Sequence, residues 1–371
     1  MARPGGRRTP SVVPRTGRRL TGLVVAVALA MCGLVIASPQ VGAGGAGGAG
    51  PGVAGAATVP SGPSGSAGMG SAGMGSTGGG STGGGSEGCG RRPVPGPTTG
   101  DPSGDVVQSL TVAGVVRSYR LAVPARYSAS RPTPLVLLFH GSGSDAIQTS
   151  LYTQLPEQAG RAGFLVATPD AIGGQWDLSE PDAHTPDLAF VHALIASLSA
   201  RYCVDRHRIA AAGISLGSEF GAIVGCTAAE GIAAIGLVAA EFPLHPCRSP
   251  LPVIAFHGTA DPIVPYRSGG TGLFLPGVPS PGSVENLTAW ARLDRCAPLP
   301  HLARIATMVV RRTWTGCRGS SSVELYTVLG GGHTWPGSPV TLSAGTFGTT
   351  TEQISATALM LGFFTHHRRG A

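Results

Sequence analysis

The sequence contains no lysine and has few charged or aromatic side chains. Charged residues make up 12% of its 371 positions, and aromatic residues make up 5%. All 26 basic residues are arginines, six of which lie ahead of residue 20, and no acidic residue precedes Glu87. The rest of the chain carries 20 arginines against 19 acidic residues, so its net charge is about +1 rather than the formal +7. We therefore expect no nucleic-acid partner, because binding to phosphates needs a concentrated positive charge.

Motifs for metals and cofactors are also missing. The chain has no Cys-x-x-Cys pair and no zinc-type spacing of cysteine and histidine, so we expect neither a metal nor a cofactor. Six cysteines follow residue 43, and an even number in an exported chain predicts three disulfides. The sequence does not choose among the many possible pairings, and free buried thiols are the alternative. The pairs that we expect are Cys89–Cys203, Cys226–Cys247 and Cys296–Cys317.

The first 88 residues are expected to lie outside the folded domain. Residues 1–43 have the pattern of a secretion signal, with arginines, an apolar run over 20–37 and small residues at 41–43. The alternative is an uncleaved membrane anchor, since the run is about long enough to span a bilayer. Residues 44–88 are mainly glycine, serine and alanine, which predicts a disordered linker because they bury too little apolar surface to fold. One extracellular, monomeric domain then covers residues 89–371.

The folded part alternates apolar runs with helical stretches. Short continuous runs such as 135–139 and 209–213 are typical of strands buried on both faces of a parallel sheet. The stretch 152–162 predicts a helix, and 305–313 predicts a further strand. Strands and helices in alternation predict an α/β fold, with a mostly parallel, twisted sheet and helices on both faces.

One Gly-x-Ser-x-Gly motif has the context of a catalytic nucleophile. The motif alone is weak, because the linker holds two chance matches, at 79–83 and 84–88. Only Ser215 lies between an apolar strand and a helix of small residues, as a nucleophile elbow requires. Glycines at 213 and 217 keep side chains out of this sharp turn. We therefore expect Ser215 to be the nucleophile.

An acid and a base follow two later strands. Asp261 ends the sequence His-Gly-Thr-Ala-Asp after the strand 252–256, and His333 follows three glycines after the strand 323–329. Serine, aspartate and histidine occur in the chain order of α/β-hydrolase triads. A serine hydroxyl needs a neighbouring base, and the base needs a third group to hold its tautomer. We expect His333 and Asp261 in these roles, with Glu241 as the alternative acid.

Two backbone N–H groups are expected to form an oxyanion hole. One comes from Leu216, the residue after the nucleophile, and the other from Ser142 in the glycine-rich turn 140–143. The remaining histidines show no pattern of a catalytic partner. His140 and His257 begin His-Gly turns at strand ends, where we expect structural hydrogen bonding rather than proton transfer.

These motifs resemble an exported esterase family that groups polyhydroxybutyrate depolymerases with feruloyl and acetyl xylan esterases. The similarity covers most of residues 89–365, and its longest and most specific marks lie at 257–266 and 331–337. The resemblance implies an α/β-hydrolase fold. It also implies secreted ester hydrolysis by the same three residues.

The resemblance implies hydroxycinnamoyl or acetyl esters of plant polysaccharide as substrates, with short polyhydroxyalkanoates as the alternative. We expect Trp176 and Trp335 to bind substrate at the rim of the site, although the core is the commoner place for tryptophan. Where the family commonly has a second glycine after the elbow, this chain has Ser218 and Glu219, and it has Asp177 where the family often has asparagine. No binding module for polymers is visible, which leaves small soluble esters open. A non-catalytic surface-binding protein and a peptidase with the same triad are the alternatives of other classes.

Overall fold

The structure, a computed structural model, describes residues 84–91, 106–179, 185–227, 231–243, 247, 249–272 and 279–370. The expected secretion signal, residues 1–43, and the linker up to residue 83 lie outside the described residues. Within the described ranges, no helix has the length and apolar character needed to cross a membrane.

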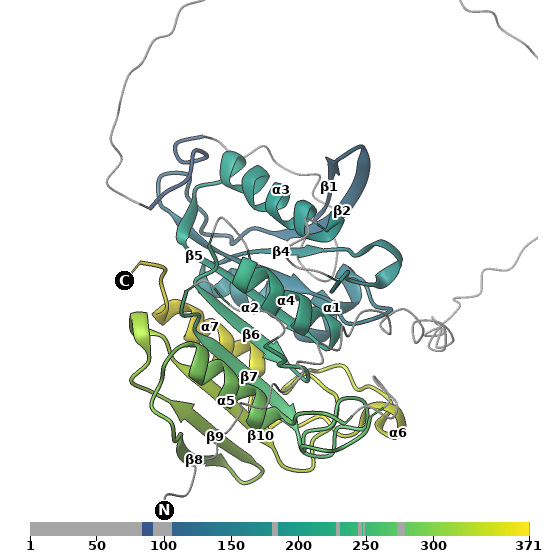
Figure 1. The fold of residues 1–371 in the computed structure, drawn as a ribbon. Coiled ribbons are helices and arrows are strands. Elements are labelled where there is room, and N and C mark those ends of the chain that lie inside the picture. Colours follow the sequence, from purple (N-terminus) through teal and green to yellow (C-terminus); the bar gives the residue numbers. More distant parts are fainter. Residues whose placement is uncertain are drawn as a thin grey trace, which may run out of the picture. The chain divides into compact units, whose positions relative to one another are not determined.

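One ten-stranded sheet forms the centre of the domain (Figure 1). Its strands are β1 (Val106–Val112), β2 (Val115–Ala122), β3 (Thr133–Phe139), β4 (Leu165–Pro169), β5 (Val204–Ile214), β6 (Ala234–Val238), β7 (Val253–Gly258), β8 (His301–Ala306), β9 (Val309–Trp314) and β10 (Val323–Val328). They follow the order β1-β2-β4-β3-β5-β6-β7-β10-β9-β8. The neighbours from β4 to β10 run parallel, and antiparallel strands flank them on each side. This mostly parallel sheet confirms the α/β-hydrolase fold expected from the motifs.

Helices cover both faces of the sheet (Figure 1). They are α1 (Ala146–Thr153), α2 (Leu155–Ala162), α3 (Pro186–Arg201), α4 (Leu216–Thr227), α5 (Ser283–Leu293), α6 (Ala344–Phe347) and α7 (Ala356–His366). Apolar side chains of α3, α4 and α5 pack on one face, and those of α2 and α7 pack on the other. Because the helices cover the two faces, loops form the surface at the carboxyl ends of the central strands.

The central strand β3 shows why its sequence lacks alternation. Leu135, Leu137 and Phe139 belong to the core on one face, while Val136 and Leu138 belong to the core on the other. All five side chains are fully buried. Because side chains along a strand point alternately to the two faces, burial on both faces requires an unbroken apolar run.

The segment 84–88, which the sequence analysis assigned to the linker, belongs to the folded domain. Ser86 donates its N–H to the carbonyl of Val204 at 3.0 Å and its hydroxyl to the carbonyl of Tyr202 at 2.7 Å. A Cβ at Gly88 would overlap the backbone of Tyr202. The glycines here permit close backbone packing, so composition alone placed the domain boundary too far along the chain.

Three disulfides join the cysteines in the expected pairs. Cys89–Cys203 ties the amino-terminal segment to the residue before β5, while Cys226–Cys247 and Cys296–Cys317 each join residues 21 positions apart. The chain-entropy model assigns about 3 kcal/mol of stabilisation to closing a loop of this size.

The three expected triad residues follow strands of the same parallel set. Ser215 follows β5, Asp261 follows β7 after a short turn, and His333 follows β10. Carboxyl ends of parallel strands meet at one edge of a sheet, which is where α/β proteins bind their ligands. The fold thus brings three distant parts of the sequence to a common edge.

Candidate active site

Ser215 occupies a sharp turn between β5 and α4. Its φ of 56° lies in the left-handed region that non-glycine residues rarely adopt. A Cβ at Gly213 would overlap the backbone of Gly217, and a Cβ at Gly217 would overlap the carbonyl oxygens of Phe139 and His140. Ser215 itself is only partly buried. A strained, crowded turn that keeps a serine accessible is the geometry of a nucleophile elbow.

The strain predicts a difference between two substitutions at this position. Glycine adopts a positive φ without the Cβ penalty, so Ser215→Gly should exceed Ser215→Ala in free energy of unfolding by about 0.5–1 kcal/mol, after allowance for the freer unfolded chain. Urea unfolding of both variants, followed by circular dichroism, measures this. Equal midpoints for the two variants would mean that the backbone at this residue is not strained.

Asp261 and His333 form a buried, hydrogen-bonded pair. His333 Nδ1 lies 2.8 Å from Asp261 Oδ2, and Asp261 Oδ1 accepts the backbone N–H groups of Ile263 and Val264 at 2.8 and 2.9 Å. Burial by itself raises the pKa of Asp261, but hydrogen bonds from His257 and His333 outweigh it and hold the pKa well below its usual range. The carboxylate is therefore anionic and accepts the Nδ1–H of His333, which leaves Nε2 as the basic nitrogen.

The loop that carries His333 reaches from β10 to α1. Trp335 donates its N–H to the Tyr152 hydroxyl at 2.8 Å, and the Ser338 hydroxyl donates to the Tyr152 carbonyl at 2.7 Å. Tyr152 lies in α1, which follows β3, and β3 is the neighbour of β5 in the sheet. These hydrogen bonds anchor the loop that carries His333 to α1, the helix that follows β3.

The glycine-rich turn after β3 lies against the nucleophile. A Cβ at Gly141 would come within 3.5 Å of the Cβ of Ser215. The His140 ring holds the turn in place, since Nδ1–H donates to the Gly141 carbonyl at 2.8 Å and Nε2 accepts the N–H of Ala171 at 3.0 Å. Burial lowers the pKa of His140, so the ring is neutral. His140 thus has the structural hydrogen-bonding role expected from the sequence.

The two expected oxyanion-hole residues flank this contact. Leu216 is the first residue of α4, and the first N–H groups of a helix have no intrahelical acceptor. Ser142 is exposed next to Gly141, and its hydroxyl accepts a hydrogen bond from Gln175 Nε2 at 2.6 Å. The assignment of the Leu216 and Ser142 N–H groups to an oxyanion hole stays a prediction.

The two tryptophans expected at the substrate rim belong to the core instead. Trp176 is 3% exposed, stacks on Phe220 with ring centroids 4.6 Å apart, and donates Nε1–H to the carbonyl of His140 at 2.9 Å. Trp335 is 1% exposed and donates Nε1–H to the Thr357 hydroxyl at 3.0 Å. That prediction was wrong because each indole N–H finds a buried acceptor, which lets the whole ring leave the surface. Through its hydrogen bond to the His140 carbonyl, Trp176 instead stabilises the turn at 140–143.

Glu241, the alternative acid, contacts a different histidine. Its Oε1 lies 2.5 Å from Nδ1 of His257, while its buried Oε2 has no hydrogen-bond partner among the described residues. His257 Nε2 lies 2.9 Å from the carbonyl of Val264 and 3.4 Å from Asp261 Oδ2. The geometry therefore favours Asp261 as the acid on His333. It also shows that His257, for which the sequence predicts structural hydrogen bonding, contacts Asp261 as a second histidine.

Glu219, one of the departures from the family pattern, is a buried acid in the first turn of α4. It is 3% exposed. Burial, and next the charge of Glu241, raise its pKa to about 8. The side chain is therefore protonated in the folded protein at neutral pH, whereas an unfolded chain would ionise it above about pH 4.3.

This difference predicts a pH-dependent stability. The folded state keeps a proton on Glu219 that the unfolded state releases. The contribution of Glu219 to the free energy of unfolding is therefore full below about pH 4 and is lost as the pH rises toward 8. Glu219→Gln removes this loss, and at about pH 8 the variant should exceed the wild type by a few kcal/mol in free energy of unfolding. Denaturant unfolding at both ends of this range provides the measurement. A gap between the proteins that does not change with pH would contradict the prediction.

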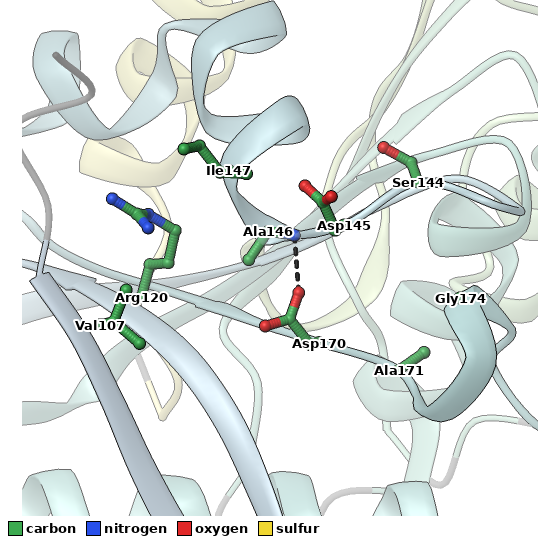
Figure 2. Close-up of a pocket in the computed structure, with 9 residues that line it drawn as sticks. All are labelled: Val107, Arg120, Ser144, Asp145, Ala146, Ile147, Asp170, Ala171 and Gly174. Carbon is green, nitrogen blue, oxygen red and sulfur yellow. Dashed lines mark hydrogen bonds between the residues drawn. The ribbon is translucent and has the colours of Figure 1, made fainter. Parts of the chain in front are cut away.

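A pocket of about 370 Å³ lies at the start of α1, with Ser144, Ala146 and Ala171 in its lining (Figure 2). Its lining includes Arg120, Asp145 and Asp170, and Asp170 accepts the N–H of Ala146 at 2.7 Å. None of the expected triad residues lines it. Asp145 accepts the N–H of Gln148 at the start of α1, and Asp170 accepts the hydroxyl of Ser118 in β2. These contacts give both carboxylates a structural role.

Comparison with known proteins shows which proteins this chain is similar to. No family model matches the chain. NocK of Nocardia uniformis subsp. tsuyamanensis, which carries the name of an esterase, is 28% identical over 299 residues, 74% of this chain and 84% of NocK. Feruloyl esterase B of Piromyces equi is 28% identical over 224 residues, 57% of this chain and 41% of that protein. The chain has the α/β-hydrolase fold and is similar in sequence to these esterases.

This esterase also resembles solved structures, although loosely. The acetyl xylan esterase from Aspergillus awamori is 15% identical, with a TM-score of 0.48 over 69% of this chain and 99% of that chain. The expected relationship to feruloyl esterases is confirmed by sequence, and the grouping with polyhydroxybutyrate depolymerases stays a prediction. Because the esterase spans less than half of feruloyl esterase B, the substrate of that protein does not transfer to it directly.

Proposed function

We propose that this protein is a secreted serine esterase that hydrolyses carboxylic esters through Ser215, His333 and Asp261. The observation that carries the proposal is the buried Asp261–His333 hydrogen bond of 2.8 Å, on the sheet edge that also bears the strained Ser215. The anionic carboxylate holds the His333 tautomer in which Nε2 can accept a proton.

In the proposed reaction, Ser215 Oγ attacks the ester carbonyl carbon while His333 Nε2 takes the hydroxyl proton. The N–H groups of Leu216 and Ser142 stabilise the negative charge that develops on the carbonyl oxygen. The tetrahedral intermediate collapses, the C–O bond to the alcohol breaks, and His333 gives its proton to the leaving oxygen. Water then hydrolyses the acyl-enzyme with His333 again as the base, which restores Ser215.

The proposed substrates are feruloyl or acetyl esters of plant polysaccharide. The relationship to feruloyl esterase B supports this class, and the departures at Ser218 and Glu219 bear on the acyl group accepted. Three disulfides and the signal-like residues 1–43 support secretion, with the membrane as a partner only if that segment is not cleaved. We propose a monomer that acts without metal, cofactor or nucleic acid.

Fluorophosphonate labelling tests the proposed chemistry. The purified wild type should lose activity as one phosphonyl group is added, and mass spectrometry of peptides should locate that group on Ser215. An unlabelled wild type, or a label on another residue, would reject the triad. A protein that merely keeps the fold and binds a partner would give the first of these results.

A substrate panel tests the class. We expect turnover of methyl ferulate or acetylated xylan to exceed turnover of hydroxybutyrate oligomers. Faster turnover of the oligomers would instead assign the enzyme to polyester depolymerisation. Cleavage of amides without cleavage of esters would identify a peptidase.

A further inference from the structure

A second histidine lies behind the acid of the proposed triad. His257, at the end of β7, is 2% exposed and lies between the carboxylates of Glu241 and Asp261. Its Nδ1 is 2.5 Å from Glu241 Oε1, and its Nε2 is 2.9 Å from the Val264 carbonyl and 3.4 Å from Asp261 Oδ2. A histidine that only stabilised a turn would not require contacts with two buried carboxylates, so this arrangement indicates a further role for His257.

The hydrogen bonds fix the protons on this ring. The Val264 carbonyl only accepts hydrogen bonds, so Nε2 must carry a proton. The Nδ1 and Glu241 Oε1 atoms share a second proton across 2.5 Å. Burial by itself lowers the pKa of His257, but the charge of Glu241 and the hydrogen bonds to both acids raise it overall. The second proton therefore belongs to Nδ1, and the ring is an imidazolium.

We propose that His257 is a positioning residue of the esterase site, a buried cation held by Glu241 that orients Asp261 toward His333. This inference rests on the proposed function. Asp261 Oδ2 faces His333 Nδ1 at 2.8 Å on one side and His257 Nε2 at 3.4 Å on the other. The carboxylate therefore has a fixed orientation even before substrate binds.

The cation also acts on the base through charge. A positive group behind Asp261 offsets part of the negative charge that His333 feels, so protonating His333 is less favourable. The negative charge of Glu241 offsets this effect only in part, because Glu241 contacts Nδ1 of His257, whereas Asp261 faces Nε2 on the other side of the ring.

Other titratable groups face this cluster from neighbouring elements. Glu219 in α4 lies close enough to Glu241 for that charge to raise the pKa of Glu219. The Tyr266 ring meets the His257 ring edge-on with centroids 5.7 Å apart, and its hydroxyl lies 3.4 Å from Arg312 Nη1. Glu219 is neutral at neutral pH and Arg312 is a surface-side partner of Tyr266. Glu241 therefore contributes most to keeping the ring charged, and Asp261 contributes next.

Two conservative variants test the proposal. Glu241→Gln removes the charge that keeps the ring protonated, and His257→Gln removes the ring. The pH dependence of kcat/KM for 4-nitrophenyl acetate reports the pKa of the free base through its acid limb. In both variants this limb should move to higher pH by about half a pH unit or more, because a nearby positive charge is lost. We also expect kcat to fall about tenfold with KM within about twofold, since no substrate contact changes.

A control and a second readout separate this role from a merely structural one. Tyr266→Phe keeps the ring against His257 but removes its hydroxyl, and its acid limb should match that of the wild type. Nitrogen-15 NMR of the histidine-labelled wild type should show a ring with both nitrogens protonated at about pH 8, well above the ordinary histidine pKa of about 6.5. Glu241→Gln should abolish that signal.

The outcomes are distinct. An unshifted acid limb in a folded Glu241→Gln variant overturns the positioning role even if the protein is an esterase. A wild type without a doubly protonated buried histidine overturns it even if His257→Gln does not fold. A wild type that cleaves no ester refutes the proposed function instead, and the NMR signal then still decides whether the buried cation exists.

Discussion

Replacing Ser215 with alanine is expected to lower kcat for ester hydrolysis by a factor on the order of 10⁶ while the domain stays folded. Alanine removes the attacking oxygen but keeps the Cβ, so the left-handed turn bears the same strain as before. Initial rates with 4-nitrophenyl acetate, together with the thermal unfolding midpoint, measure both parts of the prediction.

The matched control for this variant is Ser142→Ala. Ser142 contributes a backbone N–H to the proposed oxyanion hole, and alanine keeps that group. Ser142→Ala should therefore retain most of the activity, with only the hydrogen bond from Gln175 lost. Residual turnover of Ser215→Ala at more than about one hundredth of the wild-type rate would place the nucleophile elsewhere.

Replacing Asp261 with asparagine is expected to lower kcat by about 10⁴-fold. Asparagine fills the same space, but its NH₂ group cannot accept the proton on His333 Nδ1 if it turns toward the ring. The tautomer with the proton on Nε2 then gains population, and that nitrogen can no longer take the proton of Ser215. Steady-state kinetics at saturating substrate give the loss in kcat directly.

Glu241→Gln is the comparison that makes this result specific. Both residues contact His257, yet only Asp261 also contacts His333. The Asp261→Asn loss should therefore exceed the Glu241→Gln loss by about 100-fold or more. Equal losses would show that the two acids act as one unit, and a larger loss for Glu241 would exchange their roles.

Much of the fold could be predicted because its core is patterned simply. Continuous apolar runs identified the strands buried on both faces, and each run ended in the motif that the structure places at the sheet edge. The predicted helix at 152–162 is instead two helices, α1 and α2, that meet at Gln154 in a left-handed conformation with φ of 50°. Pro156 in the first turn of α2 fits a helix start better than a helix interior, a signal that was in the sequence.

The predicted strand at 305–313 is also two elements. β8 and β9 form an antiparallel hairpin that extends the sheet edge, and every residue of β8 is at least partly exposed. Apolar residues occur through this region at irregular spacing, so the pattern could not show where the chain reverses. Edge strands of this kind carry little core pattern because only one face and one neighbour constrain them.

The site divides in the same physical way. Ser215, Asp261 and His333 each have a local signature of strand, turn and glycine, and the structure places each of them after the predicted strand. The roles of Trp176 and His257 depend on partners that are far away in the chain, such as Phe220 and Glu241. No local pattern encodes such partners, which is why both indoles were assigned to the rim and the contact of His257 with the two acids was not predicted.

Strand β5 joins the disulfide-linked amino-terminal segment to the nucleophile turn. Its first residues lie beside Ser86 and the Cys89–Cys203 bridge, and Ser215 directly follows its last residue. A fusion partner or solid support joined just ahead of Gly84 therefore meets the domain at the end of β5 that is opposite to Ser215. Immobilisation through that end should leave Ser215 accessible to bulky polymer substrates.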